Sequence, residues 1–166
     1  MRIEIDDVSR PEVLALLEEH LLNMFELSPP EKVFAFDASK LRVPEVTCWT
    51  AWEDGKLLGC AALKEMSSSR GEIKSMRTPK SLRRKGTGRA LLAHILQVAR
   101  DRNYEELFLE TGCHPDFAAA QALYHSVGFR RCGPFGQYRE NANSVFMSLR
   151  LDEARRDNSR EHAREK

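Results

Sequence analysis

The feature that most constrains this chain is a basic segment without acids, Lys74 to Arg89, which reads KSMRTPKSLRRKGTGR. Its sixteen residues carry seven cations and no Asp or Glu, which gives a local formal charge of +7. The segment joins a strand-like run to the clearest helical pattern in the chain, and Gly86 and Gly88 stand where that helix begins. Unpaired N–H groups and the positive dipole end of a helix N-terminus bind anions. The segment therefore predicts a phosphate or pyrophosphate site.

Two common phosphate-binding motifs do not fit this segment. A P-loop requires two glycines with four residues between them, the second followed by Lys and then Ser or Thr, and no stretch of the chain matches it. A dinucleotide fingerprint requires a third glycine where Leu91 stands, and its first glycine directly follows the strand, whereas Gly86 comes eight residues after Thr78. The pattern that does occur is Arg-x-x-Gly-x-Gly, in Arg83-Arg84-Lys85-Gly86-Thr87-Gly88.

Length and composition limit the class of protein. The chain has 166 residues, of which 42% are hydrophobic, so a single folded domain is expected. Its 26 basic and 25 acidic residues nearly balance, which argues against a generally basic nucleic-acid binder. No apolar run approaches the roughly 20 residues that span a bilayer. The N-terminus lacks a signal-peptide pattern and the four cysteines form no Cys-x-x-Cys pair, so we expect a cytoplasmic protein with reduced thiols.

Periodicity and turn residues predict alternating strands and helices. In chain order they are a half-buried strand at 1–6, a helix at 11–25, a short helix within 31–41, strands at 46–53, 56–65 and 71–78, a helix at 88–102, a short strand at 107–110, a helix at 117–127, and strands at 129–133 and 144–149. The dipeptide Asp54-Gly55 favours a hairpin between the second and third strands. Residues 151–166 are mostly charged, so we expect a disordered tail after a domain of residues 1–150.

Several of these elements occur together in a family-specific order. They are the strand GEIKSMRT, the glycine loop, the helix after it, the strand LFLETG and the element ALYHSVGF. In order and spacing the chain resembles the GNAT superfamily of acetyl-CoA-dependent N-acyltransferases over residues 1–150, and it is similar to an uncharacterised bacterial branch of small-molecule acetyltransferases. The resemblance implies an α/β (α+β) GNAT fold, with a mixed, mostly antiparallel central sheet of about six to seven strands and about four helices.

The same resemblance implies a binding site for acetyl-CoA. In the family, backbone groups of the strand that matches Met76 to Thr78 pair with the pantetheine arm, and amides of the loop that matches Arg83 to Gly88 hold the pyrophosphate. The implied cofactor-binding residues are Met76, Arg77, Thr78, Arg83, Arg84, Lys85, Gly86, Thr87, Gly88 and Arg89. Which basic side chain meets the 3′-phosphate stays open. Many members have an asparagine that touches the CoA arm where this chain has Phe117, so that contact is not carried over.

Candidate catalytic residues follow from the resemblance and from their position. Tyr124 stands where the family has a tyrosine general acid, although it could also be a packed helix residue. The ordinary pKa of a tyrosine, about 10, exceeds that of a thiol, about 8.5, so the site must assist proton donation. Glu72 and Glu110 are the candidate general bases, and strand alternation places Glu72, Lys74 and Met76 on one face, where Glu72 could instead be an ordinary edge charge. Weaker candidates are His94, His114 and His125.

The predicted activity is transfer of an acetyl group from acetyl-CoA to a primary amine by direct attack in a ternary complex. We expect a small-molecule acceptor, no metal, no nucleic acid and no membrane partner, while a homodimer stays open. The alternative is a non-catalytic GNAT-fold module that binds or senses acyl-CoA. Nucleic-acid binding is a third hypothesis, which the lack of aromatic residues between Lys74 and Arg89 disfavours.

Two features bear on the acceptor side. Four aromatic residues are expected either to line an acceptor pocket or to belong to the core: Phe117, His114, Phe135 and Tyr138. Outside Lys74 to Arg89 the rest of the chain carries a formal charge of −6. This division of charge between the basic segment and the rest of the chain would suit an anionic cofactor at one end of a cleft and a cationic amine at the other.

Overall fold

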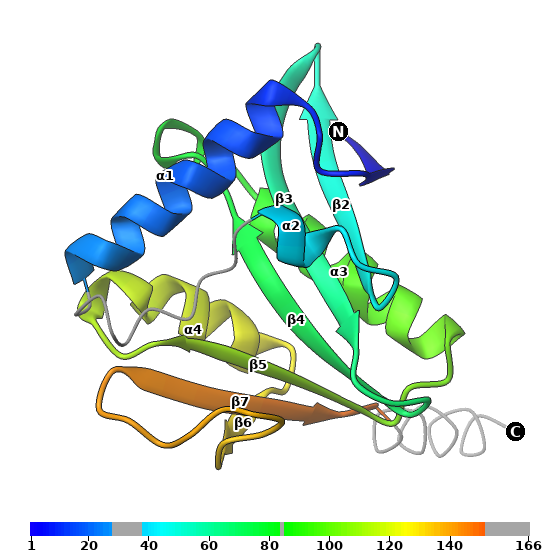
Figure 1. Ribbon diagram of the computed structural model, residues 1–166, viewed down its shortest axis with the longest axis vertical. Coiled ribbons are helices and arrows are strands. Elements are labelled where there is room, and N and C mark those ends of the chain that lie inside the picture. The colour runs from blue at the N-terminus through cyan, green and yellow to red at the C-terminus, as the bar shows by residue number, and fades with distance from the viewer. Residues whose placement is uncertain (28–37, 84, 152–166) are drawn as a thin grey trace, which may run out of the picture.

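Strands and helices alternate along the chain in the predicted order. The computed structural model describes residues 1–27, 38–83 and 85–151 (Figure 1). The elements are β1 (Arg2–Asp6), α1 (Pro11–Leu27), α2 (Ala38–Leu41), β2 (Val46–Glu53), β3 (Lys56–Glu65), β4 (Arg70–Arg77), η2 (Lys80–Leu82), α3 (Thr87–Asp101), β5 (Glu106–Gly112), η3 (Pro115–Phe117), α4 (Ala118–Ser126), β6 (Arg130–Cys132) and β7 (Ser144–Arg150). The two η elements are single turns of 3₁₀ helix that precede α3 and α4.

The strands form one mixed sheet in the order β1-β2-β3-β4-β5-β7-β6. Neighbouring strands are antiparallel except β4 and β5, which run parallel and are connected through α3. A parallel pair needs such a crossover because a tight turn cannot bring two parallel strands together. Seven strands and four α-helices in the described part of the chain confirm the predicted fold class.

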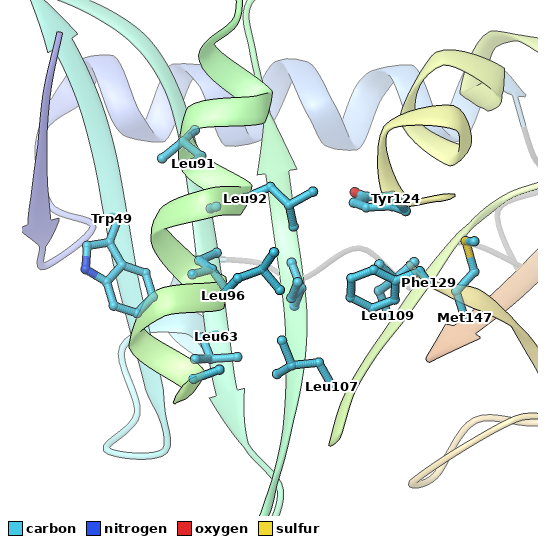
Figure 2. Packing of buried hydrophobic residues seen from close by; sticks show 14 of the residues in the cluster. Trp49, Leu63, Leu91, Leu92, Leu96, Leu107, Leu109, Tyr124, Phe129 and Met147 are labelled. Carbon is cyan, nitrogen blue, oxygen red and sulfur yellow. The ribbon is translucent and has the colours of Figure 1, made fainter. Parts of the chain in front are cut away.

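Each face of the sheet carries its own core. On one face, α3 buries Leu91, Leu92 and Ile95 against sheet residues such as Leu63 and Leu109, and α4 adds Tyr124; Figure 2 shows this packing. On the other face, α1 and α2 pack with alternate residues of β2 and β3; these are Val13, Leu16, Leu17, Leu41, Cys48, Cys60 and Ala62. Figure 1 shows α1 in front of the sheet and α3 behind it. The helical periodicity predicted for α3 is confirmed.

The sheet opens between β4 and β5. The paired positions run only from Arg70 opposite Glu106 to Ile73 opposite Leu109, although β4 continues to Arg77 and β5 to Gly112. Beyond Ile73, therefore, β4 has no partner strand on its β5 side within the described residues. The gap lies at the carboxyl end of the one parallel pair, which is where α/β sheets commonly bind ligands.

A β-bulge lies in the same part of β4. Cys60 pairs with Arg77 and Ala62 with Lys74, so β4 has one more residue than β3 in this interval, and Ser75 has a φ of 51°. An extra residue reverses the alternation of side chains. Lys74 and Arg77 therefore share a face, whereas Met76 lies on the other and packs against the core of α3 and α4. The prediction that Glu72, Lys74 and Met76 share a face is wrong.

Other expectations differ from the structure in smaller ways. Ile5 is 71% exposed although an alternating, half-buried strand was predicted there. Of the helix expected within 31–41, the structure describes Ala38–Leu41. Of the tail expected at 151–166, the structure describes Leu151, which is buried in the core and so does not belong to a solvated tail; residues 152–166 lie outside the described residues. The four cysteines are free; two of them, Cys48 and Cys60, are buried. In the portions of the chain that are described, no helix has the length and apolar character needed to cross a membrane.

Candidate active site

A cavity of about 930 Å³ lies where β4 and β5 separate. Its wall comes from the ends of both strands, from the turn before α3, from α4 and from Tyr138 in the loop between β6 and β7. Because the gap passes through the sheet, the wall includes residues from both faces. Met76 and Tyr124 belong to the face of α3 and α4, whereas Lys74, Arg77 and Glu110 belong to the opposite face.

One end of the cavity is the N-terminus of α3. Gly86 caps this helix with a φ of 84°, a left-handed conformation that glycine adopts without steric cost. The first helical hydrogen bond runs from Ala90 N to Gly86 O, so the preceding amides have no helical partner. A Cβ on Gly86 would meet no atom within 4 Å, and one on Gly88 would meet only Leu123 at 3.5 Å. The amides are therefore open to a ligand.

Polar side chains complete this end of the cavity. Thr87 is 2% exposed, and its Oγ1 has no hydrogen-bond partner among the described residues. Arg83 and Arg89 are exposed and line the cavity, whereas Lys85 is exposed and outside its lining. Arg84 lies outside the described residues. Open amides, an unpartnered hydroxyl and two guanidinium groups together suit a phosphate or pyrophosphate.

Tyr124 lies in the middle of the cavity wall, on the face of α3 and α4. Its side chain is 7% exposed, its hydroxyl is 3.9 Å from the Met76 sulfur, and its ring packs edge to face on Phe129. Burial, with the charge of Glu110 as a smaller cause, raises the pKa of Tyr124 to about 12. The hydroxyl is therefore protonated at neutral pH and can act only as a proton donor there.

Glu72 is held in a buried network on the opposite face. Its Oε2 accepts hydrogen bonds from Lys74 Nζ at 2.7 Å and from the Tyr138 hydroxyl at 2.8 Å. Lys74 also donates to the Tyr138 oxygen at 3.1 Å. Burial lowers the pKa of Lys74, with Glu72 opposing this change, and burial together with the Glu72 charge raises the pKa of Tyr138. The network ties the β6–β7 loop to β4.

Glu110 has a different environment although it lines the same cavity. It accepts a single described hydrogen bond, from Ser144 Oγ to Oε1 at 2.9 Å, and has no ion pair within the described residues. Burial, with a smaller contribution from the Glu72 charge, raises the pKa of Glu110 above its ordinary value, while the Ser144 bond lowers it. A carboxylate with a raised pKa and a free oxygen can accept a proton from a ligand in the cavity.

Arg77 occupies the end of β4 on the same face as Lys74. It is 8% exposed, and its Nε and Nη2 atoms are buried with no hydrogen-bond partner among the described residues. Its described ion pair, with Glu19 of α1, spans 3.7 Å. Burial lowers the pKa of Arg77, with the charge of Arg83 as the second cause.

The structure brings most of the predicted site residues together. Those that line the cavity are Glu72, Met76, Arg77, Thr78, Arg83, Gly86, Thr87, Gly88, Arg89, Glu110 and Tyr124. None of the three candidate histidines lines it. Phe135 lies in a buried aromatic cluster with Phe108 and Phe146 rather than in the cavity wall.

The network of Lys74, Glu72 and Tyr138 is not predicted from the sequence. Tyr138, one of the aromatic residues expected either to line an acceptor pocket or to belong to the core, lines the cavity. A lysine two positions after a glutamate, on the same face of a strand, is the local signal for this buried ion pair. No local pattern indicates that Tyr138 bonds Glu72, because the two residues lie 66 positions apart in the chain.

Phe117 packs its ring directly over Gly112. A Cβ at position 112 would lie 2.3 Å from that ring, so only glycine fits there.

Comparison with known proteins gives a consistent picture. Residues 13–129 match the model of the acetyltransferase (GNAT) family. The chain is 50% identical to YsnE, an uncharacterised N-acetyltransferase of Bacillus subtilis, over 91% of this chain and 100% of that protein. It is 46% identical to YedL, an uncharacterised N-acetyltransferase of Escherichia coli, over 91% of this chain and 95% of that protein.

Solved structures share the fold. A Klebsiella pneumoniae structure, assigned to the acyl-CoA N-acyltransferases, is 28% identical with a TM-score of 0.73, and covers 90% of this chain and 97% of its own. An aminoglycoside 6′-N-acetyltransferase complexed with coenzyme A is 16% identical with a TM-score of 0.63, over 91% of this chain and 97% of that one.

Proposed function

Because the chain belongs to the acetyltransferase (GNAT) family, we propose that it transfers an acetyl group from acetyl-CoA to a primary amine by direct attack within a ternary complex. The observation that carries this proposal is the composition of one cavity. It contains an anion seat at the start of α3, a buried proton donor in Tyr124 and a carboxylate with a raised pKa in Glu110.

The residues of the cavity suit coenzyme A. The open amides after Gly86, the Thr87 hydroxyl and the side chains of Arg83 and Arg89 would hold its phosphates. In the described part of the chain, no strand pairs with the edge of β4 beyond Ile73 toward β5, so its backbone groups are available to the amide groups of the pantetheine arm, as in strand addition to a sheet edge. The thioester at the end of that arm supplies the acetyl group.

Glu110 is the better placed of the two candidate bases. Glu72 already accepts two hydrogen bonds at one oxygen and is paired with a buried ammonium, so taking a proton would break that network. Glu110 has one hydroxyl partner among the described residues and a raised pKa, so it can take a proton without breaking an ion pair. In the proposed reaction Glu110 takes a proton from the acceptor amine.

Tyr124 completes the reaction on the leaving-group side. The amine nitrogen bonds to the thioester carbonyl carbon, the carbon–sulfur bond breaks with its electron pair on sulfur, and Tyr124 gives that sulfur its hydroxyl proton. The raised pKa of Tyr124 opposes this transfer in isolation. Burial destabilises the thiolate as well as the phenolate, however, so the apolar wall raises both pKa values together and leaves the transfer feasible.

Two measurements test the proposal. Titration calorimetry should detect acetyl-CoA binding, and a thiol-release assay across a panel of primary amines should detect turnover that depends on both substrates. Absence of binding at millimolar acetyl-CoA would contradict the proposal. Binding without turnover on every amine would instead favour an acyl-CoA-binding module.

A matched pair of glycine variants tests the anion seat. Gly86 and Gly55 both have a positive φ, of 84° and 74°, and a Cβ on either would meet no atom within 4 Å. Gly86→Ala and Gly55→Ala therefore impose a similar backbone strain, on the order of 1 kcal/mol. We expect Gly86→Ala to weaken acetyl-CoA binding about fivefold or more by displacing the amides of α3, whereas Gly55→Ala, in the β2–β3 turn, leaves the dissociation constant unchanged. Equal effects of the two variants would place the phosphates elsewhere.

A further inference from the structure

Arg77 is a buried cation that the described residues do not satisfy. Two of its guanidinium nitrogens lack a hydrogen-bond partner among the described residues, and its ion-pair partner Glu19 is 3.7 Å away with a side chain 38% exposed. Burying a charged group without hydrogen bonds is costly, and such groups in native proteins commonly mark a functional site or a bound water or ion. Because Arg77 also lines the cavity, a ligand can supply the missing acceptor.

Arg77 lies on the face of the sheet opposite to the helix that carries the anion seat. The bulge at Ser75 places its side chain on the face of Lys74, and its strand partner Cys60 packs with the core of α1 and α2. The anion seat at the start of α3 belongs to a helix that packs on the other face. Without the bulge, strand alternation would have placed Arg77 on the face of α3.

We propose that Arg77 binds a carboxylate of the acceptor, so that the acceptor is an amine that also carries a carboxylate, such as an amino acid. A guanidinium matches a carboxylate with two parallel N–H groups, and Nε and Nη2 form such a pair. On the same face, Glu72 and Lys74 neutralise each other and leave the charge of Glu110 for the ammonium end. Glu110 and Arg77 then complement the two charges of a zwitterion. This inference deepens the proposed acetyl transfer and rests on it.

The first test compares matched acceptors on the wild-type protein. Free amino acids and their carboxamides offer the same α-amine and differ in the negative charge, and thiol release gives kcat/KM for each. We expect the carboxylate form to be preferred roughly tenfold or more, as in sites built to hydrogen-bond a particular substrate group. The amine of the carboxamide is less basic and more often neutral, so intrinsic reactivity works against this result. Equal or better use of carboxamides would overturn the inference and leave the proposed function intact.

Variants of Arg77 and Arg83 then test whether Arg77 binds the carboxylate of the acceptor or a phosphate of the cofactor. Arg77→Met should reduce the preference for the carboxylate form to about one, with acetyl-CoA affinity changed by less than about threefold. Arg83→Met is the control, because Arg83 is a nearby cation that lines the phosphate end; it should weaken acetyl-CoA binding and keep the preference. If Arg77→Met weakened acetyl-CoA binding and kept the preference, Arg77 would bind a phosphate of the cofactor, and the inference would be wrong. If the protein bound acetyl-CoA but acetylated no amine of the panel, both this inference and the proposed acetyl transfer would be wrong.

Discussion

Glu72 and Glu110 are both carboxylates of the cavity wall, and their partners give them different chemistry. Glu72 compensates the buried ammonium of Lys74 and accepts the Tyr138 hydroxyl, so its negative charge has a structural use. Among the described residues Glu110 has the Ser144 hydroxyl as its hydrogen-bond partner and no cation at bonding distance. Burial therefore raises the pKa of Glu110, which suits a base.

The pH profile tests the role of Glu110. A base acts only when deprotonated, so the activity of the wild-type protein should fall as the pH falls through the pKa of Glu110, which burial raises above its ordinary value. Glu110→Gln should lower kcat roughly 100-fold and remove this acid limb from the profile. Ser144→Ala removes the hydrogen bond that lowers this pKa, so the limb should move to higher pH. An unchanged limb in both variants would assign the base elsewhere.

The role of Tyr124 is tested by separating turnover from binding. Tyr124→Phe keeps the ring that packs on Phe129 and removes only the hydroxyl, whose described contact is a weak one to the Met76 sulfur. We expect kcat to fall roughly 10- to 1000-fold while the dissociation constant of acetyl-CoA changes less than about twofold. Phe129→Leu is the control for packing, since it should lower stability without a selective loss of kcat. Normal turnover by Tyr124→Phe would assign the proton donor to another group.

At the scale of secondary structure, β4 determines how the site is divided. Its first half pairs on both sides, with β3 and β5, whereas its second half pairs only with β3. The bulge at Ser75 falls in this second half and turns Met76 toward α4 and Arg77 toward α1. One extra residue thus lets a single strand contribute to both sides of the cavity.

The positive φ of Ser75 predicts that substitutions at this position change the free energy of unfolding. A residue with a Cβ pays about 1–2 kcal/mol to adopt a φ of 51°, and a β-branched residue pays more. We expect Ser75→Gly to keep or raise the free energy of unfolding and Ser75→Val to lower it by about 1–2 kcal/mol, as measured by urea denaturation. Ser148→Val, in the regular strand β7, should not lower it, because β-branched residues favour extended backbone. Similar losses at both positions would mean that Ser75→Val acts through burial rather than backbone strain.

The whole molecule separates charge along the cavity. The segment from Lys74 to Arg89 carries +7 against −6 for the rest of the chain, and Arg83 and Arg89 line the end where α3 begins. On the other face of the sheet, Lys74 neutralises Glu72, and Glu110 has no ion pair among the described residues. An anion is therefore attracted to the end where α3 begins, before any specific contact forms.

Salt dependence tests this separation of charge. Raising ionic strength from about 0.05 to 0.5 M shortens the screening length several-fold, so the dissociation constant of acetyl-CoA should rise several-fold. Arg89→Gln removes one cation from the phosphate end and should make this dependence shallower. Tyr124→Phe changes no charge and should keep it. Calorimetry at three salt concentrations measures the slopes, and a dissociation constant that does not respond to salt would rule out an electrostatic role for the segment.

The sequence by itself determined the order of strands and helices, the Asp54-Gly55 hairpin and the glycine turn before α3, because periodicity and turn preferences act between residues close in the chain. It also predicted that Glu72, Glu110 and Tyr124 lie near one cleft, and all three line the cavity. Their separate roles needed the tertiary structure. The bulge at Ser75, the hydrogen bond between Tyr138 and Glu72 across 66 residues, and the unsatisfied guanidinium of Arg77 depend on strand register and loop closure. Those are set by packing between segments that are distant in the chain, and no local pattern encodes them.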